Sequence, residues 1–271
     1  MNSLLYKITL CTYFAATVVF VVYLVKPRDV LARAGRWLLY GGVALHALFT
    51  FLRYLEAGYT PITNLHEALS FFSLAIVGAF IAFDRRYRAP ILGSFVTPVA
   101  LVMMLLSFGF PASVSALKPA LKSRWLAAHT MFAFLGYAVF AVAFGAAIMY
   151  LIQEHFLKSR KLGPMYQKLP SLDVLDDINY RALTFGFPFL TLAIITGAVW
   201  AETAWGTYWS WDPKETWSLI TWFVYAALLH GRLTTGWRGR KAAILAIIGF
   251  FVLLFTFLGV NLLLPGLHSY K

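Results

Sequence analysis

The sequence predicts an all-α polytopic membrane protein with about eight transmembrane helices, which form a single transmembrane domain over residues 1–271. Composition is the first observation behind this prediction. Hydrophobic residues make up 61% of the chain and charged residues 13%, whereas soluble domains have about 45–50% and about 25%. The others are a series of apolar stretches of membrane length and an uneven distribution of Lys and Arg between them. A soluble enzyme and a disordered chain are therefore excluded. The single cysteine, Cys11, excludes a disulfide framework and a cysteine-based zinc site.

Six apolar stretches are long enough to cross a membrane as a helix, which needs roughly 20 mainly apolar residues. They cover about 4–25, 36–54, 65–83, 91–110, 125–152 and 242–264. Two further stretches, at about 183–201 and 213–230, are shorter or interrupted. With them the expected number of helices is eight.

The seventh helix, at about 213–230, has a start signal in Asp212-Pro213-Lys214-Glu215. Aspartate is a good N-cap, proline suits the first helical position, and glutamate three residues after the cap completes a capping box. A helix that starts at Pro213 is roughly 27 Å long by residue 230, which is just enough to cross.

The basic residues predict the orientation of the helices. Lys26, Arg28, Arg33 and Arg36 follow the first span, so its C-terminal end is expected in the cytoplasm. Alternation from there gives four inner connections with 4, 3, 5 and 4 basic residues, which is 16 of the 23 in the chain. Both termini and the connection between the sixth and seventh helices are then expected outside. The longest inner connection, about 153–182, is expected to be a solvated connector or a short amphipathic helix.

The outer connection at about 200–217 holds five of the nine tryptophans. Tryptophan favours membrane–water interfaces, but an interfacial belt accounts for one or two at each helix end and not for a cluster mixed with Gly, Asp, Lys and Glu. We interpret the cluster as a flat apolar surface for a large planar ligand, because indole rings offer wide, rigid contact area. Lys214 could pair with an anionic group of that ligand. Haem, a quinone and a polyprenyl carrier all fit the composition.

Two histidines are expected on the outer side beside this loop. His129 lies one turn into the fifth span, and His268 lies four residues beyond the eighth. Neutral imidazole is a good iron ligand, so the pair favours haem among the planar ligands. The alternative for each is an ordinary hydrogen-bonded polar group.

Two more histidines lie in predicted helices, where ionisable groups are functional candidates. His46 sits halfway along the second span and is either an interhelical hydrogen-bonder or a ligand. His230 ends the seventh span near the inner surface, roughly 26 Å along the helix from its start. It is either a ligand or an interfacial residue beside Arg232.

Other polar residues at the outer ends of the second and third spans have more ordinary expectations. Arg53 and Glu56 are one turn apart and are expected to pair or to border the site. Asn64 and Glu67 begin the third span, where an N-cap and a first-turn acid are typical. No arrangement of a nucleophile with a base stands out, and no catalytic residue is assigned.

The sequence WGTYWSWDPKETW at residues 205–217 resembles the tryptophan-rich WWD signature of haem-handling proteins in cytochrome c maturation. Within that group it is most similar to the CcsA/ResC type of the System II pathway. The eight spans, Ala128-His129-Thr130 and the stretch at 259–270 extend the resemblance over most of the chain. One departure is His66, where the family usually has tyrosine.

The resemblance implies that His129 and His268 hold the iron of haem b, a transported substrate, beside the loop at about 200–217. It implies a second, intramembrane haem site at His230, whose other ligand comes from a separate ResB-type membrane partner. The implied reaction joins haem to the reduced CxxCH cysteines of apocytochrome c, with thiol-reducing proteins as further partners. The implied location is the bacterial inner membrane rather than a thylakoid, with the loop on the periplasmic face. The loop residues expected at the haem are Trp205, Trp209, Trp211, Asp212, Lys214 and Trp217.

Two other functions remain open at this point. A haem exporter would move haem outward without any ligation chemistry. A b-type electron-transfer subunit would hold haem permanently between histidines at matched depth on adjacent helices. His46 and His230 are offset by several residues in predicted depth, which argues mildly against this second function.

Overall fold

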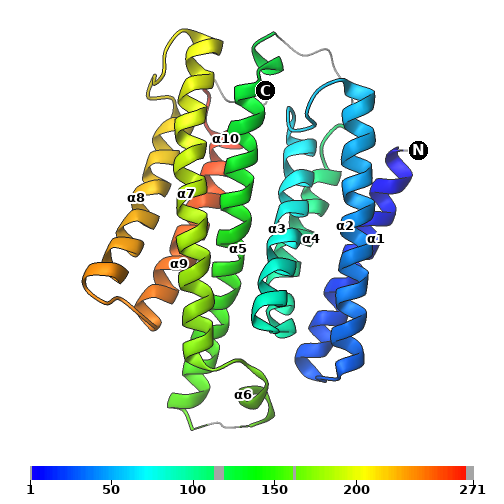
Figure 1. Cartoon of the computed structure of the whole chain (residues 1–271), viewed down its shortest axis with the longest axis vertical. Coiled ribbons are helices and arrows are strands. Elements are labelled where there is room, and N and C mark those ends of the chain that lie inside the picture. Colours follow the sequence, from blue (N-terminus) through cyan, green and yellow to red (C-terminus); the bar gives the residue numbers. More distant parts are fainter. Residues whose placement is uncertain (1, 113–118, 161–162, 267–271) are drawn as a thin grey trace.

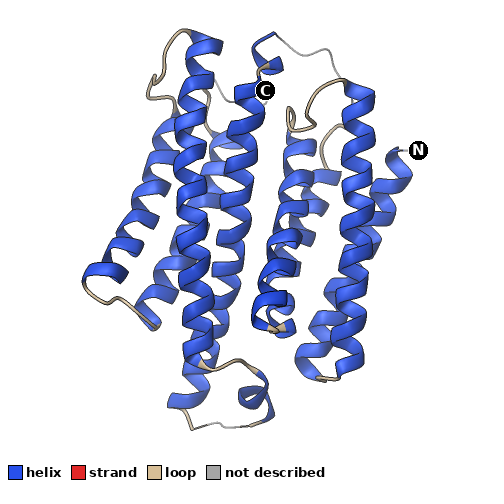
Figure 2. Ribbon diagram, in the orientation of Figure 1, coloured by secondary structure: helices blue, strands red, loops and turns tan. Residues whose placement is uncertain are grey.

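The computed structural model describes residues 2–112, 119–160 and 163–266, and these residues form helices and loops without a β-strand (Figure 2). The long helices are α1 (Asn2–Val25), α2 (Asp29–Ala57), α3 (Leu65–Tyr87), α4 (Gly93–Phe108), α5 (Arg124–Lys158), α7 (Leu172–Trp205), α8 (Pro213–Thr234) and α9 (Arg240–Leu254). The short helical segments are η1 (Pro90–Leu92), η2 (Pro119–Lys122), α6 (Pro164–Lys168), η3 (Phe255–Gly259) and α10 (Val260–Leu263).

Consecutive long helices run in opposite directions along the bundle (Figure 1). Within the described residues, seven segments are long and apolar enough to cross a membrane, and the last of them joins α9, η3 and α10. Helix α8, which is seventh in chain order, is not among these seven segments, but it also runs along the bundle. It has 22 residues and lies beside α7 and α9, so the described residues pass along the bundle eight times (Figure 1). The structure thus confirms an all-α polytopic membrane protein, and α8 corresponds to one of the two stretches that the sequence marked as shorter or interrupted.

The even number of passages places three features at one end of the bundle, which we call the loop end. They are the start of α1, the loop at residues 206–212 between α7 and α8, and the end of α10 (Figure 1). The turns between α1 and α2, α3 and α4, and α8 and α9 lie at the opposite end. This grouping agrees with the predicted alternation of the connections.

The predicted connector at about 153–182 is wrong in its bounds. Helix α5 continues to Lys158 and α7 already begins at Leu172, so only residues 159–171 connect them, with α6 inside that segment. Ser171 caps α7 by accepting a hydrogen bond from the backbone N–H of Val174. The first turns of α7 are polar, so a search for apolar stretches finds only the later part of the helix.

Helices α5 and α7 are the central pair of the bundle and pack closely (Figure 1). A Cβ atom on Gly136 of α5 would lie 3.2 Å from the carbonyl oxygen of Gly186 on α7, and one on Gly186 would lie 2.6 Å from the ring of Phe140. Small residues of this kind let membrane helices approach each other. Phe140 in turn stacks on Tyr225 of α8, with ring centroids 3.7 Å apart. This packing fixes α5, α7 and α8 relative to one another.

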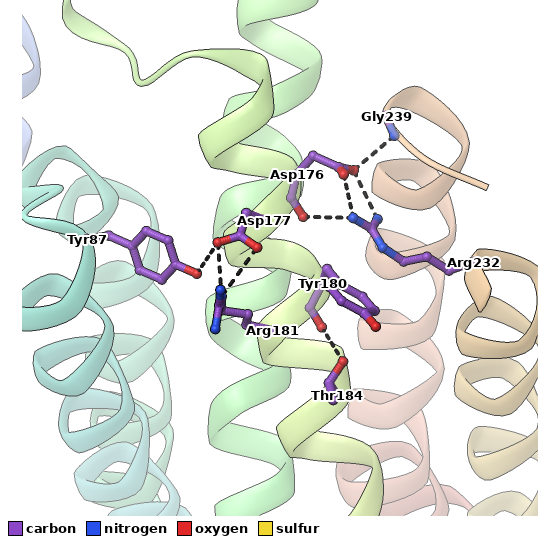
Figure 3. A network of polar contacts seen from close by, with 8 residues as sticks. All are labelled: Tyr87, Asp176, Asp177, Tyr180, Arg181, Thr184, Arg232 and Gly239. Carbon is purple, nitrogen blue, oxygen red and sulfur yellow. Dashed lines mark hydrogen bonds and ion pairs between the residues drawn. The ribbon is translucent and has the colours of Figure 1, made fainter. Parts of the chain in front are cut away.

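A network of polar contacts joins α7 to α3, α8 and the start of α9 at the end of the bundle opposite the loop (Figure 3). The carboxylate of Asp176 on α7 accepts hydrogen bonds from the guanidinium of Arg232 on α8, at 3.0 Å from Nη1, and from the backbone N–H of Gly239, at 2.9 Å. The neighbouring carboxylate of Asp177 accepts from the Tyr87 hydroxyl of α3 at 2.6 Å. Asp176 therefore connects α7, the end of α8 and the start of α9.

We expect Asp176→Ala to lower the free energy of unfolding by about 3 kcal/mol, because removing one member of a buried ion pair leaves the other charge uncompensated. The side chain of Arg232 is only 6% exposed. Thermal unfolding of the purified protein in detergent measures the change. Asp173→Ala is the matched control, since Asp173 is exposed in the first turn of α7, and we expect it to change stability by less than about 1 kcal/mol. Equal effects of the two substitutions would contradict the prediction.

Candidate functional site

The loop at residues 206–212 is held by caps at both of its ends. Gly206 ends α7 with φ +75°, a left-handed conformation that glycine adopts without strain. At the start of α8, Asp212 and Glu215 form the capping box that the sequence predicts. The carboxylate of Glu215 also accepts the backbone N–H of Ser210 at 2.8 Å, in addition to that of Asp212 at 3.1 Å. The buried Glu215 thus fixes the second half of the loop.

His129 faces this loop from the loop end of α5, and its ring has a defined tautomer. Its Nδ1 lies 2.7 Å from the backbone carbonyl oxygen of Ala193 on α7. A carbonyl oxygen only accepts hydrogen bonds, so Nδ1 carries the proton and Nε2 keeps a lone pair. Within the described residues Nε2 makes no hydrogen bond. Histidines that bind metals typically have this arrangement, in which one ring nitrogen donates to a carbonyl and the other is the ligand.

The imidazole of His129 is confined by two residues of α7. Gly197 lies against the ring, and a Cβ atom there would be 2.7 Å from Nδ1. Trp200 stacks on the ring, with centroids 6.4 Å apart and planes 15° from parallel. The orientation of His129 therefore depends on a close approach that only glycine permits at position 197.

A small cavity of about 60 Å³ lies between His129 and the loop. Its lining includes His129 and Tyr137 of α5, Tyr208 and Trp209 of the loop, and Lys214 and Glu215 of α8. Sites for small organic ligands usually measure about 300–1,000 Å³, so a large ligand would enter only if part of the loop moved outward. Tyr208 is 60% exposed and lies on the outer side, where such a movement has room.

The last span reaches the site through its final residues. Nζ of Lys214 donates to Oδ1 of Asn261 on α10 at 3.0 Å. Gly266 lies against Asp212, since a Cβ atom on Gly266 would be 2.5 Å from its Oδ2. His268, predicted as the second iron ligand, lies outside the described residues.

A π-helical turn, η3, sets the direction of these final residues. The N–H of Val260 bonds to the carbonyl of Phe255, five residues earlier. The hydroxyl of Thr256 lies 2.7 Å from that of Thr221 on α8, and both side chains are buried. A Cβ atom on Gly259 would lie 2.5 Å from the Phe255 ring, so glycine is required there. Such turns are often found at functional sites.

The tryptophans of the site meet at steep angles and do not form one continuous plane. Trp200 and Trp205 contact each other at 65°, with centroids 4.9 Å apart, and Trp209 and Trp211 at 89° and 5.6 Å. Trp217 packs on Phe255 at a centroid distance of 4.5 Å. Trp211 is 68% exposed and has φ +59°. Trp211 is thus the exposed indole of the loop, and Trp209, which contacts it, lines the cavity.

His230 and His46 lie away from this cavity. His230 is exposed near the far end of α8, and Arg232 beside it is engaged by Asp176. His46 is fully buried in α2, where Nδ1 lies 3.2 Å from the Tyr13 hydroxyl and Nε2 lies 2.8 Å from the Ser70 hydroxyl. Of the two expectations for His46, the structure supports the interhelical hydrogen-bonder, because both ring nitrogens are occupied.

The ion-pair partner that the structure gives Arg53 is a residue of another helix. Arg53 forms an ion pair with Glu67 on α3, with Nη2 and Oε1 2.9 Å apart, and both side chains are buried. Glu67 lies deeper in the bundle than a typical first-turn acid, and a buried guanidinium needs a buried counter-charge. The N-cap predicted at Asn64 is confirmed, since its side chain accepts the N–H of Glu67 at 2.9 Å.

Sequence reasoning missed three residues that shape the site: the carbonyl of Ala193, Gly197 and Asn261. Ala193 and Gly197 are one turn apart on α7 and face His129 only because of how α5 packs on α7. Nothing in the local sequence marks them. Asn261 offered a weak signal, because an amide among apolar residues near the end of a span needs a partner.

His66 is also buried, and its Nδ1 lies 2.9 Å from the carbonyl oxygen of Ser107. Its ring lies 5.1 Å from that of Tyr6, in the half of the bundle formed by α1–α4. It is not part of the lining of the cavity at His129.

These features define a class: a polytopic helical membrane protein with an aromatic, histidine-containing site at one end of its bundle. The chain belongs to the cytochrome c assembly protein family, whose family model matches residues 62–268. The matched range includes His129 and the whole loop. This confirms the resemblance to proteins of cytochrome c maturation that the sequence indicated, and it gives the chain a role in cytochrome c biogenesis.

Curated relatives agree with this assignment. The cytochrome c biogenesis protein CcsA of Guillardia theta is 41% identical over 237 residues, which cover 80% of this chain and 79% of the relative. The protein of the same name from Microcystis aeruginosa is 41% identical over 266 residues, with 80% and 81% covered. That of Synechocystis is 38% identical over 273 residues, with 80% and 82% covered.

The fold is also found in a solved structure, the cytochrome c heme lyase CcmF. The two folds match with a TM-score of 0.64 at 19% sequence identity. The match covers 96% of this chain and 48% of the lyase chain, so this chain spans about half the length of that protein.

Proposed function

We propose that this protein binds haem b as a transported substrate at the loop end and presents it to the reduced CxxCH cysteines of apocytochrome c. The observation that carries the proposal is the state of His129, whose Nδ1–H is engaged by the Ala193 carbonyl while Nε2 keeps its lone pair beside the tryptophan loop. A neutral imidazole oriented in this way suits the iron of a haem.

His268 is the proposed second axial ligand. It follows Gly266 by two residues, and Gly266 lies against Asp212 at the start of α8. Gly266, the last described residue, therefore lies at the same end of the bundle as His129. Two imidazole ligands would keep the iron six-coordinate until a histidine of the substrate protein replaces one of them.

The loop residues would form the rest of the haem site. Trp209, which lines the cavity, and the exposed Trp211 would offer aromatic surface to the haem. Trp205 packs on Trp200 and Trp217 packs on Phe255, and these contacts hold the two ends of the loop. Lys214 is close enough to the cavity to exchange its contact with Asn261 for a haem propionate. Because the cavity measures about 60 Å³, binding requires Tyr208 and Trp209 to move outward between the caps at Gly206 and Asp212.

The chemical step is the addition of a cysteine thiol across a haem vinyl group. Sulfur bonds to one vinyl carbon, hydrogen is added to the other, and no group leaves. The contribution of this chain is positioning, since holding the vinyl group beside the thiol replaces a bimolecular encounter and can contribute up to roughly 7–11 kcal/mol. No residue is assigned as a general base.

His230 is proposed as a ligand of a second haem site, shared with a ResB-type partner. Its exposure near the opposite end of α8 suits a site completed by another chain. Thiol-reducing proteins would keep the apocytochrome cysteines reduced. The proposed location is the bacterial inner membrane, with the loop end on the periplasmic side.

One of the two alternative functions is poorly supported by the histidines of the bundle, and the other needs an experiment. A b-type electron-transfer subunit needs buried histidines with a nitrogen available to iron, and both nitrogens of His46 are engaged by Tyr13 and Ser70. A haem exporter would use the same binding site without any ligation, so it is separated from our proposal by experiment.

The proposal is tested with the His129→Ala/His268→Ala double variant, purified with and without the ResB-type partner. We expect the bis-histidine haem absorption of the outer site to disappear and to return when imidazole is added, because free imidazole replaces the missing ligands. His155→Ala is the control, since His155 lies near the far end of α5. Undiminished bis-histidine absorption in the double variant refutes the assignment. Haem transport by the double variant without cytochrome maturation would favour an exporter.

A further inference from the structure

A second cavity lies at the end of the bundle opposite the loop and is strongly basic. Its volume is about 740 Å³, within the range of small-molecule sites. It is formed where α1 ends, α2 begins and α3 ends. Its charged lining consists of four arginines and two aspartates: Arg33, Arg36, Arg85, Arg88, Asp29 and Asp84.

Only part of this positive charge is neutralised by the protein. Arg36 and Asp84 form a two-point ion pair, with Nε–Oδ2 at 2.6 Å and Nη2–Oδ1 at 3.0 Å. Arg85 lies over the ring of Tyr40, 5.2 Å from its centroid. Among the described residues, Arg33 and Arg88 form no ion pair and donate no side-chain hydrogen bond. The cavity therefore has an excess of two positive charges and two guanidinium groups available to an anion.

The surroundings of the cavity indicate where that anion comes from. Three large apolar side chains next to it on α1 and α2 point away from the protein: Val25 is 66% exposed, Val30 65% and Trp37 72%. Trp37 also contacts Tyr40, with ring centroids 5.8 Å apart. Tryptophan and tyrosine of this kind mark the level of the lipid headgroups in a membrane. The basic cavity thus adjoins the surface that contacts lipid.

We propose that this cavity binds the phosphate of an anionic phospholipid headgroup, held by Arg33 and Arg88, while its acyl chains lie along the exposed apolar surface of α1 and α2. Guanidinium groups match the geometry of phosphate oxygens and are less strongly hydrated than ammonium groups. Basic pockets between membrane helices are known headgroup sites. The Arg36–Asp84 pair and the Arg85–Tyr40 contact hold the walls of the cavity around the two free arginines.

The test is a titration of the purified full-length protein in detergent, followed by native mass spectrometry. The three probes are phosphatidylglycerol, phosphatidylcholine and inorganic phosphate. We expect phosphatidylglycerol to bind well above phosphatidylcholine and well above inorganic phosphate. Arg33→Gln/Arg88→Gln is expected to weaken phosphatidylglycerol binding by about thirtyfold or more, because each guanidinium would lose its direct, charge-assisted hydrogen bonds to the phosphate.

The matched control is Arg28→Gln/Arg86→Gln. Both residues are exposed at the same end, next in sequence to the cavity, but neither lines it, and the change in net charge is the same. We expect this control to stay within about threefold of the wild type, because neither side chain lines the cavity and exposed charges are screened by salt. Equal weakening in both double variants would show general surface attraction and overturn the proposal. So would equal binding of inorganic phosphate, which would identify a site for a free anion.

A further variant covers the case in which the glutamine double variant does not fold. Arg33→Lys/Arg88→Lys keeps both charges but removes the planar guanidinium groups. We expect it to retain the preference for phosphatidylglycerol over phosphatidylcholine with several-fold weaker binding. A wild-type protein without that preference would overturn the proposal on its own.

Discussion

Gly197→Ala is expected to reduce haem retention at the loop end by about 10- to 100-fold, as is typical when the residues that orient a metal ligand are changed. The added methyl group would lie 2.7 Å from Nδ1 and 2.9 Å from Cε1 of His129. The ring must then rotate or shift, and its hydrogen bond to Ala193 is lost. The measurement is the absorption of haem that co-purifies with the variant.

The matched control for this prediction is Gly78→Ala in α3. A Cβ atom on Gly78 would meet nothing within 4 Å, so this substitution tests the same chemical change without the contact. We expect normal haem retention and unchanged or slightly higher stability, because alanine is the better helix former. A wild-type haem spectrum in Gly197→Ala would show that the position of His129 tolerates displacement and would remove the main support for its role.

The second large effect is expected from Glu215→Ala. The carboxylate of Glu215 accepts the backbone N–H groups of Ser210 and Asp212 and is only 9% exposed. Its removal leaves these donors without partners and is expected to lower the free energy of opening the loop by about 3 kcal/mol. That corresponds to roughly hundredfold faster amide exchange at Ser210 and Asp212. Hydrogen-exchange mass spectrometry of the loop peptide measures it.

Two variants sharpen this experiment. Glu202→Ala removes an exposed carboxylate at the end of α7, on the same side of the molecule, and is expected to change exchange in the loop by no more than a few fold. Glu215→Gln keeps one acceptor oxygen and is expected to lie between the wild type and Glu215→Ala. If loop exchange is the same in Glu215→Ala and Glu202→Ala, the loop is held by contacts other than this carboxylate.

The parts of the structure that the sequence predicts well depend on local rules. The capping box at Asp212 and Glu215 and the N-cap at Asn64 were predicted from residues three positions apart. The order and direction of the helices followed from apolar length and from the distribution of Lys and Arg. These predictions succeed because capping and membrane insertion are decided within one segment.

The parts that the sequence does not predict depend on contacts between segments. Arg53 has an acidic neighbour one turn away at Glu56, yet it pairs with Glu67 on another helix. The partner of His129 is a backbone carbonyl 64 residues away, which no side chain reveals. The start of α7 at Leu172 was missed because its first turns are polar and extend the helix beyond the apolar stretch. In each case the packing of the helices selects among options that are locally equivalent.

The π-helical turn at residues 255–259 divides the last span into a first part that packs in the core and a final part that contacts the candidate site. One additional residue in a helical turn rotates everything after it by about 100°. Before the turn, Phe250 and Leu253 fill the core. After it, Asn261 meets Lys214 and the chain continues toward Asp212. Because of this angular offset, removing one residue from the turn would rotate Asn261 and the residues after it away from Lys214 and Asp212, even if every side chain before the turn kept its place in the core.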